Sequence, residues 1–96
     1  MYPVIFLEKA IAELEDAFVY LEEKENNLGL KFIKKTEEYL SIIQKNPAIF
    51  VDDYKGVRQV RIVPFSYILR YKVFKKYLAI IQIYHSKQNS IKKRKA

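Results

Sequence analysis

The apolar residues of this chain follow two different periods, and the period changes at Pro47. From Leu7 to Leu21 they recur in steps of three and one, which places them on one stripe of a helix. The stretch from Phe32 to Ile43 repeats at three and four, and Pro47 cannot continue that helix. From Val57 onward, β-branched and aromatic residues suit pleated, half-buried strands. The sequence therefore predicts two helices followed by a sheet.

Smaller signals set the boundaries of these elements. Val4-Ile5-Phe6 suits a first strand, and the run from Glu25 to Gly29 contains the Asn and Gly that tolerate the left-handed end of a helix. The expected strands cover residues 57–63, 67–74 and 77–84, with room for a further short strand at 49–51, and the turns lie at Pro64-Phe65-Ser66 and Lys75-Lys76. We predict an α+β fold, in which an N-terminal strand and an antiparallel helical hairpin pack on a three- to four-stranded twisted antiparallel sheet.

The length of 96 residues predicts a single domain. We expect residues 1–86 to form this domain and residues 87–96 to form a basic C-terminal tail. The absence of cysteine excludes disulfides and Cys-ligated metals, and one histidine cannot hold a metal alone. Two glycines cannot build a P-loop or a dinucleotide fingerprint. No apolar run approaches the roughly 20 residues of a membrane span, so we expect a cytoplasmic protein that uses no cofactor and no membrane.

The charges of the chain are segregated by sign. Residues 1–54 hold all eleven acids and six lysines, a net charge of −5, whereas residues 55–96 hold twelve basic residues and no acid, a net charge of +12. Solubility alone does not require such segregation, although basic strands and a basic tail do keep a protein soluble. We expect a positive face or groove that attracts phosphates or a carboxylate-rich partner.

A cationic group lies on the predicted sheet. Because side chains alternate along a strand, Arg58 and Arg61 point to opposite faces, so one of them lies at the helix side or at a strand end. Each arginine offers a planar fork of donors for phosphate or carboxylate. The alternative is an arginine whose stem covers the edge of the core and whose head pairs with Asp52 or Asp53. The whole group consists of Arg58, Arg61, Arg70, Lys72, His85 and Lys87.

His85 is the single histidine and ends the last predicted strand. A histidine titrates near neutrality, so it can act as general acid or base in phosphoryl chemistry. The alternative is a partly buried strand-end residue that is hydrogen-bonded to the backbone. Tyr67, Tyr71 and Tyr77 lie among the basic residues, where they either stack on bases or pack within the sheet.

Three segments carry a resemblance to a known family. They are Gly56-Val57-Arg58-Gln59-Val60-Arg61, Pro64-Phe65-Ser66-Tyr67-Ile68-Leu69-Arg70-Tyr71 and Ile80-Ile81-Gln82-Ile83-Tyr84-His85-Ser86-Lys87. Their order and spacing, together with the stripe from Leu14 to Leu21 and with Asn46-Pro47, resemble the small toxins of the RelE/ParE superfamily. The resemblance covers nearly the whole chain.

The resemblance implies the toxin of a bacterial type II toxin–antitoxin system of the plasmid-stabilisation type. Its partners would be a cognate antitoxin, in a toxin–antitoxin hetero-oligomer, and a cellular target. An acidic antitoxin segment lying along the basic sheet would match the charge segregation. The RelE-like branch of the superfamily cuts messenger RNA on the ribosome without a metal, and the ParE-like branch inhibits DNA gyrase.

Departures from the nuclease pattern favour the ParE-like branch and thus gyrase as the target. Ile68 stands where these nucleases place an arginine, and the tail has Ser86-Lys87-Gln88 and lysines in place of an arginine and a terminal tyrosine. The alternatives are a non-toxic nucleic-acid-binding module and a reduced nuclease site, with His85 as base or acid and Arg61 and Lys87 as phosphate clamps. The residues expected to bind partner or phosphate are Arg58, Arg61, Arg70, Lys72, Lys87, Lys92, Lys93 and Arg94.

Overall fold

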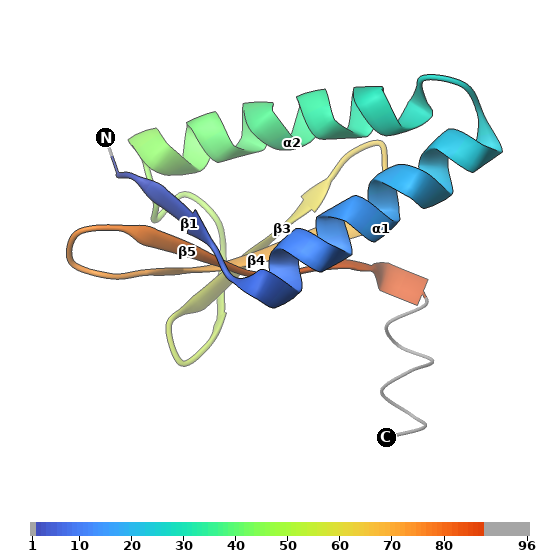
Figure 1. Cartoon of the computed structure of the whole chain (residues 1–96). Coiled ribbons are helices and arrows are strands. Elements are labelled where there is room, and N and C mark those ends of the chain that lie inside the picture. The colour runs from blue at the N-terminus through green and yellow to red at the C-terminus, as the bar shows by residue number, and fades with distance from the viewer. Residues whose placement is uncertain (1, 88–96) are drawn as a thin grey trace.

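The computed structural model describes residues 2–87, without the side chains of Asp53 and Tyr54 (Figure 1). Its elements are β1 (Val4–Phe6), α1 (Glu8–Lys24), α2 (Leu28–Lys45), β2 (Asp52–Tyr54), β3 (Val57–Ile62), β4 (Tyr67–Val73) and β5 (Leu78–His85). The predicted α+β fold is confirmed, with one strand and two helices ahead of the main strands. The predicted tail falls outside the described residues, except for Lys87.

The five strands form one sheet in the order β1-β5-β4-β3-β2. The predicted antiparallel meander is β3, β4 and β5, and β2 adds an antiparallel strand beside β3. β1 pairs with β5 in parallel, so the sheet is mixed. The short strand starts at Asp52 and not at Ile49, because residues after Pro47 still belong to the turn that ends α2, in which the Ile49 N–H donates to the Asn46 carbonyl (3.1 Å).

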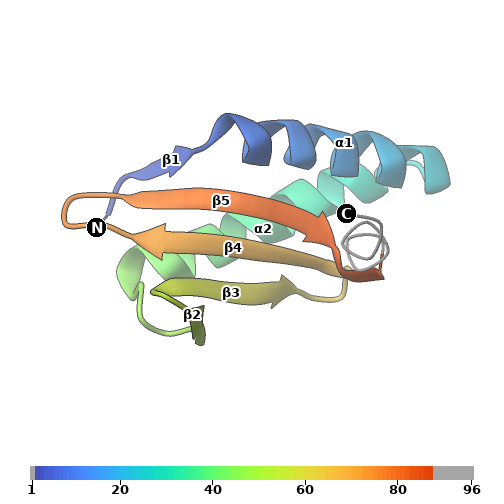
Figure 2. The same cartoon turned by 90° about the horizontal axis from the view of Figure 1, so that it is seen from below.

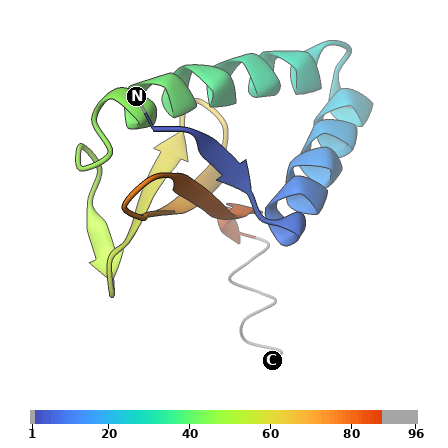
Figure 3. The same cartoon turned by 60° about the vertical axis from the view of Figure 1, so that its left-hand side comes forward.

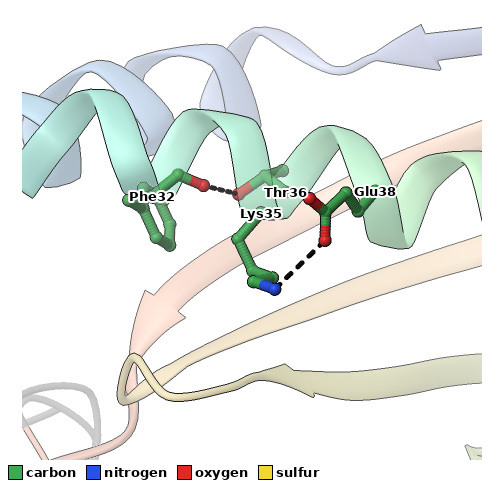
Figure 4. A network of polar contacts seen from close by, with 4 residues as sticks. All are labelled: Phe32, Lys35, Thr36 and Glu38. Atoms are coloured by element: carbon green, nitrogen blue, oxygen red, sulfur yellow. Dashed lines mark hydrogen bonds and ion pairs between the residues drawn. The ribbon is translucent and has the colours of Figure 1, made fainter.

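Both helices contribute to one core, which lies against one face of the sheet. Alternate residues of β4, namely Tyr67, Leu69 and Tyr71, are buried together with Phe32 of α2. The ring of Phe32 packs against that of Tyr67 at 4.9 Å between centroids. Thr36 is the buried polar residue of the described chain, and its hydroxyl donates to the Phe32 carbonyl at 2.9 Å (Figure 4). The Lys35–Glu38 ion pair (3.1 Å) beside it is solvent-exposed, so it adds little stability.

The two helices approach each other closely where they meet, and they diverge from that turn (Figure 3). Asn27 takes the left-handed conformation (φ 71°) before α2, whereas Gly29 lies within the helix. The carboxylate of Glu22 in α1 accepts hydrogen bonds from the backbone N–H groups of Asn27 and Leu30, each at 3.1 Å. An acidic side chain from one helix therefore caps the N-terminus of the next, where N–H groups lack helical partners.

Gly29 is required by this close approach. A Cβ atom at this position would lie 2.7 Å from the Phe18 carbonyl oxygen and 2.8 Å from Cγ of Glu22. The predicted role of this glycine at a helix end thus belongs to Asn27, and Gly29 instead makes room for α1.

We expect Gly29→Ala to destabilise the protein although alanine favours helices. Overpacking costs about 1–3 kcal/mol, and the gain in helix propensity is about 1 kcal/mol. Because the clash is with the backbone oxygen of Phe18, the upper part of the overpacking range applies. The free energy of unfolding, measured in urea, should therefore fall by about 1–2 kcal/mol. Ser41→Ala, at an exposed position of the same helix, is the control and should change it by less than about 0.5 kcal/mol. Equal values for the two variants would contradict the packing role of Gly29.

Candidate functional site

The face of the sheet that points away from α2 carries most of the cationic side chains of the strands. Figure 2 views this face, with α2 behind the strands. Because the buried residues of β4 alternate with the others, Ile68, Arg70 and Lys72 must point to this side. We call it the open face, and the register places on it Gln59, Arg61, Ile68, Arg70, Lys72, Gln82 and Tyr84.

Arg61, Arg70 and Lys72 form a cationic patch on the open face. Arg70 lies in the middle, where its Nη1 donates to Oε1 of Gln82 at 3.1 Å. Arg61 is solvent-exposed and lies two register pairs away, towards the β3–β4 turn. No residue of β3, β4 or β5 on this face is acidic. The patch can therefore bind carboxylates or phosphates without internal competition.

Arg58 points to the opposite side of the sheet. It pairs in register with the buried Tyr71, and its Nη1 donates to the backbone carbonyl of Phe50 at 2.7 Å. The carboxylate of Asp52 accepts a hydrogen bond from the Gly56 N–H (3.2 Å). Of the two arginines in β3, Arg58 is thus the one on the helix side. Its contact with the Phe50 carbonyl helps to hold the loop before β2 in place.

His85 also lies on the helix side. It pairs in register with buried Tyr67, and the two rings meet edge to face at 5.1 Å. Its Nδ1 accepts a hydrogen bond from the Lys87 N–H at 3.3 Å. Arg61 points to the open face, so the structure does not bring Arg61 and His85 onto one face of the sheet.

Burial is the largest cause that lowers the pKa of His85 below 6.5, followed by the positive charges of Lys24, Lys87 and Arg61. The imidazole is consequently neutral at pH 7, and Nδ1 is free of a proton to accept the hydrogen bond from Lys87.

A cavity of about 360 Å³ lies between α1 and β5, beside His85. Glu13 of α1 lines it, and its Oε1 accepts a hydrogen bond from the Ile83 N–H at 2.8 Å. The helical period of the sequence placed Glu13 on the solvent face of α1. Its contact with the strand depends on the helix position and has no signal in the sequence.

The remaining candidate residues lie towards the C-terminus. Lys87 is exposed, while Lys92, Lys93 and Arg94 lie outside the described residues. Among residues 2–87, no group of His, Cys, Asp and Glu side chains could hold a metal ion. None of the helices in this part of the chain is long and apolar enough to cross a membrane.

The sequence matches one family model, described as the ParE toxin of the type II toxin–antitoxin system parDE, over residues 4–90. No curated protein matches the chain.

Several solved structures share the fold. A chain of the chromosomal ParDE system from P. aeruginosa superposes with a TM-score of 0.76 at 19% identity, covering 88% of this chain and 96% of that one. A chain of the intact E. coli RelBE toxin–antitoxin complex gives 0.66 at 18% identity, with coverages of 86% and 94%. YoeB from Staphylococcus aureus, solved as a dimer, gives 0.61 at 24% identity, with coverages of 88% and 97%.

The lowered pKa of His85 predicts a pH-dependent stability. The folded protein binds this proton less readily than the unfolded chain, so the free energy of unfolding falls as the pH drops below about 6.5. Between about pH 7 and pH 5, the wild-type protein should therefore lose more stability than His85→Gln, which cannot titrate. Urea unfolding at both pH values checks this. Carboxylates titrate in both proteins, so an equal loss would contradict the role of His85.

Proposed function

The chain belongs to the family of ParE toxins of type II toxin–antitoxin systems, and we propose that it acts by binding and inhibiting DNA gyrase, without catalysis. We propose further that an acidic segment of its cognate antitoxin neutralises it on the open face, within a toxin–antitoxin hetero-oligomer.

The residues of the open face are the observation that supports a binding function over a nuclease activity. Ile68, which stands where related nucleases are expected to have an arginine, lies on this face between Arg61 and Tyr84. A nuclease site would need its acid or base beside its phosphate clamps. His85 and Arg61 point instead to opposite sides of the sheet.

The charge of the open face supports the proposed antitoxin contact. Arg61, Arg70 and Lys72 present positive charge on every second register pair, without an acid among the strand residues beside them. An extended acidic segment would complement this pattern and accelerate association. The E. coli RelBE structure is that of a toxin–antitoxin complex, so a neighbour in fold is known in a complex of this kind.

A supercoiling assay tests the gyrase proposal. The purified protein should inhibit supercoiling by gyrase when present in about equimolar amounts, because an inhibitor that only binds acts stoichiometrically. His85→Gln should inhibit equally, since this side chain has no part in the proposed binding.

The main alternative is a ribosome-dependent messenger RNA endonuclease. The neutral imidazole of His85, next to Lys87, is the observation that favours it. Cleavage of messenger RNA on ribosomes that disappears in His85→Gln, with supercoiling unaffected by the wild-type protein, would establish this alternative and refute the gyrase proposal.

The open face should determine antitoxin affinity. Replacing both Arg61 and Arg70 by Gln removes two charges, each worth about 0.5–1 kcal/mol at a partly exposed contact, and should weaken binding about tenfold. Binding of the cognate antitoxin can be measured by isothermal titration calorimetry. Lys31→Gln with Lys34→Gln on α2 removes the same net charge and should leave the affinity nearly unchanged. Equal losses in both variants would show that net charge, and not the open face, governs binding.

A further inference from the structure

The turn between β4 and β5 is a tight, rigid hairpin tip. The Phe74 N–H donates to the Tyr77 carbonyl at 2.9 Å, which closes a two-residue turn formed by Lys75 and Lys76. Neither lysine has a positive φ, and both side chains are exposed. The tip projects at the end of the sheet opposite the α1–α2 turn (Figures 1 and 2).

Two aromatic rings stiffen this tip. The rings of Phe74 and Tyr77 stack at 4.8 Å between centroids with an interplanar angle of 16°. The ammonium group of Lys72 lies 5.5 Å from the centre of the Phe74 ring, close enough for a cation–π contact. Phe74 is nevertheless 38% exposed, so the rings form a small platform at the surface. The platform holds Lys72 next to the two turn lysines.

The three lysines at the tip have no acidic partner in the described part of the chain. None of Lys72, Lys75 and Lys76 pairs with a carboxylate among the residues whose side chains the structure describes. The chain also has no acid anywhere after Asp53. Three lysines within five residues of one hairpin therefore attract anions.

We propose that this hairpin tip, consisting of Lys72, Phe74, Lys75, Lys76 and Tyr77, binds the phosphate backbone of double-stranded DNA. A two-stranded β-ribbon fits the width of the major groove, and lysine heads at its end reach the flanking phosphates as point charges. The Phe74 ring holds the Lys72 ammonium group, and the rings of Phe74 and Tyr77 stack on each other and not on bases. Binding is consequently independent of base sequence.

The contact with DNA does not depend on gyrase being the target. It adds a direct interaction with nucleic acid to the family function, at the end of the sheet. Lys72 also belongs to the cationic patch proposed for the antitoxin, so the DNA contact is tested at Lys75 and Lys76, which lie outside that patch.

Fluorescence anisotropy of a labelled duplex of about 20 base pairs, titrated with the full-length protein at salt concentrations from about 50 to 200 mM, tests the proposal. Lys75→Gln with Lys76→Gln should weaken binding by about tenfold or more and reduce the slope of log K against log salt by about 1.8, or 0.9 per lysine. The single Lys76→Gln variant should show about half of that slope change. The matched control is Lys31→Gln with Lys34→Gln, which has the same net charge and should bind the duplex like the wild-type protein. The basic residues after Lys87 are present in every variant, so their contribution cancels in the comparison.

Three results would overturn the proposal. Equal weakening by the turn and helix variants would assign the binding to net charge, and an unchanged slope in the turn variant would remove the tip from the contact. Displacement of the duplex by polyglutamate as effectively as by unlabelled duplex, at the same concentration of charge, would make the tip a surface for acidic proteins. Thermal unfolding of each variant verifies that the substitutions at these exposed positions leave the fold intact.

Discussion

Burial of one side of β4 is the constraint on which the arrangement of the molecule depends. Tyr67, Leu69 and Tyr71 enter the core beneath α2, and the Tyr71 hydroxyl donates to the Pro47 carbonyl at 2.7 Å, which ties the end of α2 to the sheet. Because side chains along a strand alternate between the two faces of the sheet, Arg70 and Lys72 must face outward. The same packing that stabilises the fold thus creates the cationic patch of the open face.

A β-bulge in β5 decides which side chains of that strand lie beside the patch. The register between β4 and β5 shifts between Arg70 and Tyr71, so that Arg70 faces Gln82 while Tyr71 faces Ile80, and Ile81 is the extra residue. Without this shift, residues beyond Ile81 would exchange sides, and His85 would point to the open face. The bulge therefore places His85 on the side of the sheet opposite to Arg61 and Arg70.

The two halves of the charge distribution have different physical roles. In α1, the Glu13 carboxylate accepts a hydrogen bond from the Ile83 N–H and the Glu22 carboxylate caps α2, so these acids satisfy backbone groups that would otherwise lack partners. In the basic strands, Arg58 makes a comparable hydrogen bond, to the Phe50 carbonyl. Arg70 is partly buried and donates to Gln82, whereas the charge of Arg61 is directed to solvent and is available to a partner.

The sequence by itself determined the order of elements, the α+β class, the turns at residues 64–66 and at Lys75-Lys76, and the segregation of charge. These follow from local periodicity and composition, which act within a few residues of the chain. The sequence also required Arg58 and Arg61 to point to opposite faces of the sheet, but it did not determine which of the two faces the helices. The tertiary structure decided that question, the parallel pairing of β1 with β5, the role of Gly29 and the side on which His85 lies. Each of these depends on strand register or helix approach, which are set by packing between residues distant in the chain.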